Sequence, residues 1–285
     1  MPELPEIEVL VRHLRPLLRG RVVRRVEVRR ARVLRPDLPH KFRRAMLGAT
    51  FTGLSRRGKY LLFQLEPRNH GTPFLVLGHL GMTGRMFLVE KDRRLPKHAA
   101  MVLDLGDSNF VYEDTRYFGR MSLDASAVEK LGPEPLDGQF TPDVFARSLK
   151  RSRQAVKVKL LDQSLVAGIG NIYASEALFR ARLSPRLAAD QLTAGQAKRL
   201  WQAVREVLTE AIACGSTVPL NFGPDKTGRL FYFGRAPGAP DYFAERLQVY
   251  DRAGKPCPRC GGRIERMAQS GRSTFYCPRC QKPRD

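Results

Sequence analysis

The sequence predicts an α+β protein: an N-terminal β-sandwich flanked by helices, then a helical domain, then a small hairpin that carries cysteines. Before residue 134, apolar residues alternate with polar ones in several short segments, which is the pattern of half-buried strands. After the stretch 132–135, whose Gly-Pro-Glu-Pro composition suits a linker, the apolar residues recur at helical spacing. Four of the five cysteines lie between residues 257 and 280. We therefore expect three domains, at residues 1–134, 135–243 and 244–285.

The composition indicates a polyanionic partner. The chain of 285 residues has 50 Lys and Arg against 28 Asp and Glu, a net charge of +22. Such an excess predicts binding to nucleic acid or to an anionic membrane. No apolar run approaches the roughly eighteen residues of a membrane span, and the acidic N-terminus is unlike a signal peptide. We expect a soluble, intracellular protein that binds nucleic acid, although charge alone does not separate an enzyme from a packaging protein.

The first six residues, Met-Pro-Glu-Leu-Pro-Glu, allow two interpretations. Removal of Met1 would expose the secondary amine of Pro2, and α-amino groups have a pKa of about 7.7–8.0. Such an amine can attack an electrophilic sugar or carbonyl carbon and form an iminium, while Glu3 takes or gives protons. In the structural alternative, Pro2 and Pro5 start a helix, and Glu3 and Glu6 complement its dipole. The stretch alone favours the structural alternative, and the rest of the chain reverses that preference.

A helix is expected from Pro5 to Leu18, because apolar residues recur there at helical spacing and Gly20 supplies a stop. This helix would hold the N-terminus against a core. The segments that follow alternate, and residues 106–109, Gly-Asp-Ser-Asn, are a hairpin turn signal. Several short strands at regular spacing argue for a sandwich. The expected strands are Arg21–Val28, Ala49–Leu54, Lys59–Leu65, Phe74–Leu77, Arg85–Val89, Ala100–Leu105 and Phe110–Glu113.

Beyond the linker the expected elements are helices. A glycine-bearing turn at residues 165–171, Leu-Val-Ala-Gly-Ile-Gly-Asn, leads into one helix N-terminus. Backbone N–H groups at such a turn suit a phosphate. A tight helix–turn–helix corner capped by Asn171 explains the same residues, and both interpretations stay open. The expected helices are Val144–Lys150, Ala155–Leu161, Ile172–Ala181 and Thr193–Ala213.

Two features distinguish the C-terminal part. Residues 215–243 are rich in Gly, Pro and aromatic residues, and a loop of this length is usually functional or mobile. In a reducing compartment, two Cys-x-x-Cys pairs predict zinc rather than disulfides. Four thiolates form a closed tetrahedral site, so this zinc would be structural. The pairs bracket a hairpin whose tip, residues 270–273, would hold Arg272 outward. The expected ligands are Cys257, Cys260, Cys277 and Cys280.

Five separated stretches together resemble the bacterial formamidopyrimidine-DNA glycosylases, base-excision enzymes that remove oxidised purines. They are Pro2–Glu6, Arg57–Leu61, His79–Gly84, Gly168–Tyr173 and the four-cysteine hairpin with Gly271–Cys277. The resemblance covers essentially the whole chain. It implies a helix–two-turns–helix element at the glycine turn, one structural Zn2+, and a monomer in the bacterial cytoplasm, associated with the nucleoid. The implied partner is double-stranded DNA that contains oxidised purines or abasic sites.

The resemblance also implies chemical roles. Pro2 N would attack C1′ of the damaged nucleotide, displace the base and leave a sugar iminium, with Glu3 as proton donor or shuttle and Glu6 in support. Successive β- and δ-elimination would cut the strand on both sides of the lesion. Lys59 would contact DNA and assist proton transfer, and Arg272 would grip phosphates and assist the second elimination. Pure phosphate binding by Lys59 and Arg272 is the alternative.

To reach C1′ the enzyme must extrude the nucleotide, and side chains must fill the void. By resemblance these are Met82, Arg116 and Phe118. Inserted apolar wedges are a known device of DNA-binding proteins, whereas core packing is the alternative for Met82 and Phe118. Tyr117 departs from the doubly basic pair that is common in the family.

Other positions match DNA-contacting residues of the family. Asn171 and nearby backbone N–H groups would bind phosphates that flank the lesion, and the glycine- and proline-rich loop would recognise the flipped purine through Thr217. Three more basic positions match. They are His98, Arg153 and Lys157.

Two rival functions are weighed against this one. The oxidised-pyrimidine branch, endonuclease VIII, is disfavoured by the Pro-Glu-Leu-Pro-Glu start and by the methionine, arginine and phenylalanine set. A non-catalytic zinc-finger DNA-binding protein has no reason to keep Pro2 and Glu3. Catalysis through Pro2 requires that Met1 be removed, because a chain that retains Met1 would bind DNA without forming the iminium.

Overall fold

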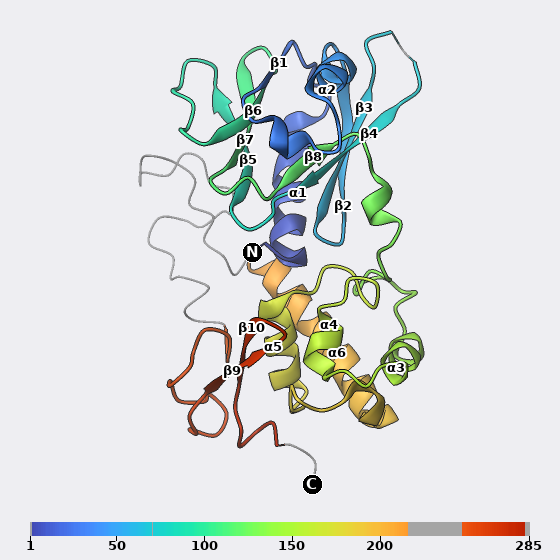
Figure 1. Ribbon diagram of the computed structural model, residues 1–285, viewed down its shortest axis with the longest axis vertical. Coiled ribbons are helices and arrows are strands. Elements are labelled where there is room, and N and C mark those ends of the chain that lie inside the picture. The colour runs from blue at the N-terminus through green and yellow to red at the C-terminus, as the bar shows by residue number, and fades with distance from the viewer. Residues whose placement is uncertain (1, 70, 216–246, 283–285) are drawn as a thin grey trace. The chain divides into compact units, whose positions relative to one another are not determined.

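The computed structural model describes residues 2–69, 71–215 and 247–282 (Figure 1). Within these residues the chain divides into two compact units. The N-terminal unit contains Pro2 and residues 6–129. The C-terminal unit contains residues 3–5, 130–215 and 247–282.

The N-terminal unit contains two antiparallel four-stranded sheets, as the alternating pattern predicts. In one sheet the order is β1-β6-β7-β5, with β1 at Arg25–Val28, β6 at Ala99–Asp104, β7 at Ser108–Asp114 and β5 at Gly84–Glu90. In the other the order is β2-β3-β4-β8, with β2 at Thr50–Arg57, β3 at Tyr60–Glu66, β4 at Phe74–His79 and β8 at Arg120–Ser122.

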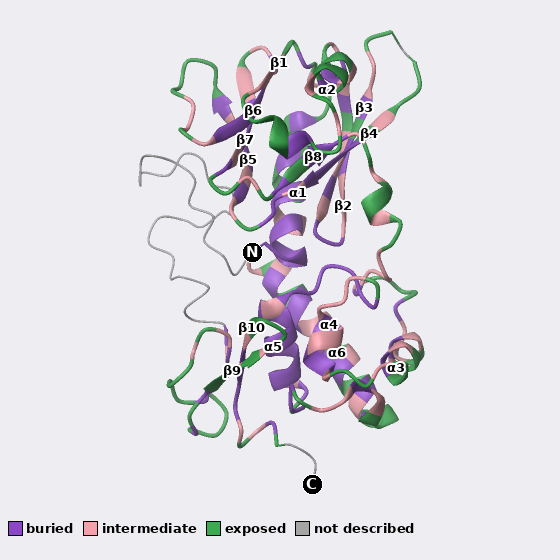
Figure 2. Cartoon of the chain, viewed as in Figure 1, coloured by how far each residue is buried: buried purple, intermediate pink, exposed green. Residues whose placement is uncertain are grey.

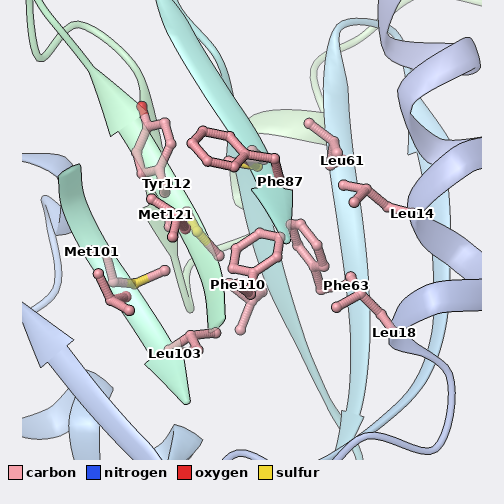
Figure 3. Close-up of a cluster of buried hydrophobic side chains, with 14 of the residues drawn as sticks. Leu14, Leu18, Leu61, Phe63, Phe87, Met101, Leu103, Phe110, Tyr112 and Met121 are labelled. Atoms are coloured by element: carbon pink, nitrogen blue, oxygen red, sulfur yellow. The ribbon is translucent and has the colours of Figure 1, made fainter. Parts of the chain in front are cut away.

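Helix α1, Leu4–Leu18, packs on the sandwich core through the side chains that recur at helical spacing. Figure 3 shows Leu14 and Leu18 beside Leu61 and Phe63 of β3, and the rings of Phe63 and Phe110 meet edge to face at 5.7 Å. Burying a Leu or Phe side chain contributes about 1.5–3 kcal/mol. The core of this unit therefore holds α1, and α1 fixes where the N-terminus of the chain lies.

Four elements of the N-terminal unit were not predicted from the sequence. Helix α2, Pro39–Met46, buries only Phe42 and Met46, and its four other basic or polar positions hide the helical period. The other three are too short to show a period. They are the 3-10 helices η1 (Ala31–Leu34) and η2 (Ser126–Val128) and strand β8. The strand expected at residues 21–28 begins later, at Arg25, and Val22 forms only an isolated bridge to Thr50.

The C-terminal unit is built on four helices, α3 (Pro142–Lys150), α4 (Val156–Leu160), α5 (Asn171–Arg180) and α6 (Ala194–Ala213), and a short 3-10 helix, η3 (Ala189–Gln191), lies between α5 and α6. The Thr141 and Thr193 hydroxyls cap α3 and α6, and Gln196 completes a capping box with Thr193. Helix α5 is buried almost all round (Figure 2). It is therefore the central helix of this unit.

A two-stranded hairpin, β9 (Glu265–Gln269) and β10 (Arg272–Tyr276), follows. Ser270 and Gly271 form its turn with φ of 47° and 71°, and a type I′ turn requires positive φ at both of these positions. Arg272 is therefore the first residue of β10, directly after the turn. A small core, including Phe179 of α5 and Phe275, joins the hairpin to α5. Among the described helices, none is long and apolar enough to cross a membrane.

Candidate active site

The Glu3 carboxylate lies at the N-terminus of α5. It accepts hydrogen bonds from the backbone N–H groups of Gly170 (2.7 Å), Ile172 (2.9 Å) and Tyr173 (3.4 Å). The first N–H groups of a helix have no partner within it, and the helix dipole favours negative charge there. Glu3 is only 1% exposed, so these donors replace water and stabilise its charge. A buried carboxylate is thus held in one orientation, next in sequence to Pro2.

The two glycines of the turn before α5 make room for the N-terminus of the chain. A Cβ on Gly170 would collide with the Glu3 carboxylate, and one on Gly168, where φ is +87°, would lie 2.7 Å from the Leu4 side chain. Leu4 N donates to Gly168 O at 3.0 Å. The helix cap is Gly170, and Asn171 is the first helical residue. The turn is therefore a tight helix–turn–helix corner, but its cap is not Asn171. Glu3 accepts from the three backbone N–H groups that could otherwise bind a phosphate.

Lys157, on α4, is fully buried beside this site. Its ammonium donates to Asn171 Oδ1 (2.6 Å), Thr274 Oγ1 (2.7 Å) and Ser273 O (3.1 Å). Asn171 Nδ2 also donates to Ser273 O, at 2.9 Å. The pKa of Lys157 is lowered to about 8, mainly by burial and in part by the charge of Arg272, while Glu3 opposes the shift. All three ammonium protons are engaged, so Lys157 joins α4, α5 and the hairpin rather than reaching outward.

Glu176, one turn further along α5, was not identified from the sequence. It is buried and accepts from the backbone N–H groups of Gln248 (2.9 Å), Val249 (2.9 Å) and Tyr250 (2.8 Å). Burial raises the pKa of Glu176, and these donors oppose the shift. Glu176 thus fixes the chain just before the hairpin to the same helix that holds Glu3. The signal available in the sequence was an acidic side chain among apolar ones on a buried helix.

In the N-terminal unit, the three residues expected to fill the void lie together. Met82 and Phe118 are each 48% exposed, which excludes core packing for both. Arg116 Nη1 lies 3.4 Å from Met82 Sδ, and the Arg116 guanidinium is 4.7 Å from the centroid of the Phe118 ring. Two loops, β4–β5 and β7–β8, therefore present one exposed wedge.

The buried carboxylate of Asp114 holds these two loops together. It accepts from Thr83 Oγ1 (2.6 Å) in one loop, and from Arg116 N (3.1 Å) and Gly119 N (2.8 Å) in the other. Tyr117, between the wedge residues, has a left-handed φ of 54° and is half-buried. Asp114 could not be identified from the sequence, because a single acidic residue at a strand end is common.

The Lys59 side chain is 8% exposed, and its positive charge affects the pKa of His79, at the end of β4. The pKa of His79 is lowered to about 4, mainly by burial and in part by the charges of Lys59 and Arg120. His79 is therefore neutral at pH 7, and its Nδ1 accepts from Gly81 N at 3.1 Å. His98 is half-buried, with its carbonyl accepting from Asp114 N at 3.2 Å.

The remaining expected residues differ in exposure. Pro2 and Glu6 are buried. Arg272 is exposed at the start of β10, and the Arg153 side chain is 96% exposed, 4.0 Å from Asp190. Thr217 lies outside the described residues.

The four expected zinc ligands form one cluster. The sulfur atoms of Cys257, Cys260, Cys277 and Cys280 lie within 4.8 Å of one another. Two Sγ–Sγ distances are 3.9 and 3.5 Å. Zn–S bonds of about 2.3 Å in a tetrahedron put sulfur atoms about 3.8 Å apart. The cluster therefore fits one zinc ion with no open position.

Comparison with known proteins identifies the family. Residues 1–121 match the formamidopyrimidine-DNA glycosylase N-terminal domain, residues 131–220 its H2TH domain, and residues 254–283 a zinc finger found in these enzymes and in IleRS. The chain belongs to the formamidopyrimidine-DNA glycosylase family. The family's helix–two-turns–helix fold and zinc finger, expected from the sequence, are thus confirmed.

Relatives match over the whole chain. Formamidopyrimidine-DNA glycosylases of Symbiobacterium thermophilum and Paracoccus denitrificans are 41% and 42% identical over 99% of this chain, covering 89% and 100% of those proteins. Two solved structures of the Lactococcus lactis family member, one with abasic-site DNA and one with Fapy-dG DNA, have TM-scores of 0.85 at 30% and 32% identity. Each match covers 99% of this chain and 100% of that one.

Proposed function

We propose that this chain is a bifunctional DNA glycosylase and abasic-site lyase that excises oxidised purines, such as 8-oxoguanine and formamidopyrimidines, from double-stranded DNA. Family membership over the full length supports the reaction class, and the solved relative with Fapy-dG DNA supports the lesion class. The observation that carries the proposal is the Glu3 carboxylate, fixed on the α5 N-terminus directly beside Pro2 in the chain.

The first step uses the amine that Met1 removal exposes. Pro2 N attacks C1′, the bond from C1′ to the base breaks, and the base leaves with a proton. Opening of the sugar ring, with protonation of its oxygen, gives an iminium between C1′ and Pro2. The neighbouring Glu3 carboxylate stabilises this cation and carries the protons. The helix N-terminus holds the carboxylate in place, so no reorganisation is needed during the step.

The second step cuts the strand. Loss of a proton from C2′ expels the 3′ phosphate, and loss of a proton from C4′ then expels the 5′ phosphate. Water finally releases the sugar remnant and returns Pro2. Lys59 and Arg272 bind the departing phosphates, whose charge they neutralise. Arg153, Asn171 and His98 contribute further phosphate contacts, and Lys157 acts by holding Asn171 and the hairpin.

Extrusion of the damaged nucleotide leaves a gap in the duplex. The exposed wedge of Met82, Arg116 and Phe118 fills it, since its apolar surfaces replace base stacking and its guanidinium reaches polar base edges. Thr217 and its neighbours recognise the flipped base. When bound, zinc supplies only a structural cross-link that fixes the hairpin carrying Arg272.

A second lesion class has support of its own. One solved structure of the Lactococcus lactis relative contains oxidised-pyrimidine DNA, at 31% identity to this chain. Oxidised pyrimidines are therefore a secondary substrate class, as in the endonuclease VIII branch. We also infer that the protein acts as a monomer in the bacterial cytoplasm on nucleoid DNA.

Borohydride trapping tests the proposal. Protein with Met1 removed is incubated with duplex that carries 8-oxoguanine opposite cytosine, reduced, and mapped by mass spectrometry. A covalent link at Pro2 is the expected result. A link at Lys59 would keep the enzyme class and move the nucleophile. Tight DNA binding without any covalent link would contradict the mechanism and favour a non-catalytic DNA-binding protein.

A further inference from the structure

The N-terminal unit carries a strongly basic segment that the proposed reaction does not use. Residues 19–44 contain eleven Lys and Arg but only two acidic residues, Glu27 and Asp37. This segment therefore carries a net charge of +9, out of +22 for the whole chain. We call the surface formed by β1, η1, α2 and their flanking residues within 19–44 the basic face.

We propose that the basic face binds the phosphates of duplex DNA outside the lesion site. The inference rests on the proposed function, because the partner is the same DNA. Duplex DNA carries one charge per about 1.7 Å of its axis, so a surface that follows it can engage several cations at once. Such contacts carry no base information and serve undamaged DNA equally well.

The cations of the basic face are available. All except Arg21, which is half-buried, are exposed. Among the described residues, only two of the eleven form ion pairs, Arg21 with Asp107 (2.8 Å) and Arg29 with Glu27 (2.7 Å). Asp37, the other acidic residue, instead accepts from Ser122 Oγ and Leu123 N. The positive charge is therefore largely uncompensated.

The elements β1, η1 and α2 adjoin one another, and the surface that they form extends to the wedge. Helix α2 contacts both β1 and η1, and η1 contacts β8. The guanidinium of Arg32 lies 5.8 Å from the centroid of the Phe118 ring, and Arg30 Nε donates to Tyr117 Oη at 3.3 Å. The basic face thus begins at the loop that we expect to enter the duplex. DNA held by that loop continues directly past these cations.

Two structural roles account for only part of this charge. Charged side chains on an edge strand such as β1 prevent edge-to-edge pairing, but one or two suffice. Arg43 and Arg44 lie in the last turn of α2, where they complement the helix dipole. The remaining cations repel one another in the free protein, a cost that a polyanionic partner removes.

The salt dependence of binding tests the inference. A variant with Arg25→Gln, Arg43→Gln and Arg44→Gln removes three exposed cations from β1 and α2. Its affinity for an undamaged duplex of about 30 base pairs is measured across NaCl concentrations. Each phosphate contact contributes about 0.9 to the slope of log K against log salt. We expect the slope to become shallower by about 2–3.

Two controls distinguish the loss of cations from the basic face from an equal loss of net charge elsewhere. A variant with Lys198→Gln, Arg199→Gln and Lys255→Gln removes the same charge from exposed positions of the C-terminal unit, and its slope should change by less than about 1. Replacing Arg25, Arg43 and Arg44 by Lys should preserve the wild-type slope. Thermal melting of each variant, and the single variant Arg25→Gln, guard against misfolding.

An unchanged slope in the glutamine variant overturns the inference, as does an equal fall in the C-terminal control. Self-association of the glutamine variant with an unchanged slope would assign the charge to edge protection instead. If the wild-type protein forms no trapped adduct at Pro2, only the proposed function is contradicted. Phosphate binding by the basic face is measured independently, by the slope of log K against log salt.

Discussion

At the residue scale, Glu3 combines both interpretations of the N-terminal sequence. It complements a helix dipole, as the structural alternative states, but the helix is α5 and not the helix that Glu3 precedes. Local sequence could not identify this partner, because residues 3 and 170 meet only through the fold. The same limit applies to Gly168 and Gly170, whose spacing also suits a phosphate loop.

Glu3→Gln should lower single-turnover excision by about 10²–10⁴, the usual contribution of a general acid or base. The amide keeps the length of the side chain but loses the charge that stabilises the iminium. Glu8→Gln is the matched control, because Glu8 lies on α1, close to Glu3 in the chain, but pairs with Arg12 (2.8 Å) of the same helix and with Arg56 (2.9 Å) of β2. Equal losses of excision rate in both variants would show that Glu3 has no specific role in the reaction.

Lys157→Met should destabilise the protein, because it leaves Asn171 Oδ1 and Thr274 Oγ1 without this donor, whereas Ser273 O still accepts from Asn171 Nδ2. Each buried polar group so affected costs about 1–3 kcal/mol. Denaturant unfolding measures the loss. Excision should fall as well, since Asn171 and Arg272 lose a common support. A variant with wild-type stability and reduced phosphate binding would show instead that Lys157 contacts DNA directly.

The same lysine predicts a pH effect. Its folded pKa of about 8 lies below its unfolded value, so the unfolded chain binds more protons between pH 8 and about 10.4. The free energy of unfolding of wild type, relative to Lys157→Met, should therefore rise with pH across this window and stay constant below it. Unfolding both proteins at several pH values checks the sign. A difference that falls as pH rises would mean that the three acceptors outweigh burial.

At the element scale, long periodic segments were predictable and short ones were not. Helices α1 and α6 follow the expected ranges within a residue or two, because a wide apolar stripe repeats over several turns. Helix α2 and strand β8 were missed, since α2 buries only Phe42 and Met46 over its eight residues and the three residues of β8 give no period. The glycines beside the wedge residues predict that these residues lie in loops. The role of Asp114 could not be predicted, because it depends on two loops that meet only in the folded structure.

Asp114→Ala should uncouple the two wedge loops. It removes the acceptor for Thr83 Oγ1, Arg116 N and Gly119 N, so the wedge loses its fixed shape. We expect excision from duplex DNA to fall at least about tenfold, because a misplaced group readily costs more than that. Cleavage of an abasic site in single-stranded DNA should change little, since no void must be filled. Equal losses on both substrates would point to general unfolding.

Zinc removal should loosen the hairpin. Cys257 and Cys277 belong to the small core that joins the hairpin to Phe179 of α5. Structural zinc contributes about 10–16 kcal/mol of apparent binding free energy in finger peptides. Chelation, or Cys260→Ser, should weaken binding to lesion-containing DNA and expose hairpin amides to hydrogen exchange. Cys214→Ser, at the end of α6, should retain one zinc per chain by metal analysis. Wild-type affinity for lesion-containing DNA after complete zinc loss would contradict this role.

At the scale of the whole molecule, composition predicted the class of partner and the family resemblance predicted the lesion. Neither could give the basic face, because eleven cations spread over 26 residues look like an ordinary solvated run until β1, η1 and α2 are seen to adjoin. The boundaries of the three expected domains stay predictions.

The net charge of +22 predicts opposite salt dependences for folding and binding. Like charges repel across the folded surface, and NaCl screens this repulsion, so the melting temperature should rise between about 0.05 and 0.2 M salt. DNA affinity should fall by about 10³–10⁵ over the same range if six to ten phosphates are contacted. Melting curves and binding titrations in the same buffers measure both. A melting temperature that falls with salt would mean that ion pairs such as Arg56–Glu8 outweigh the excess positive charge.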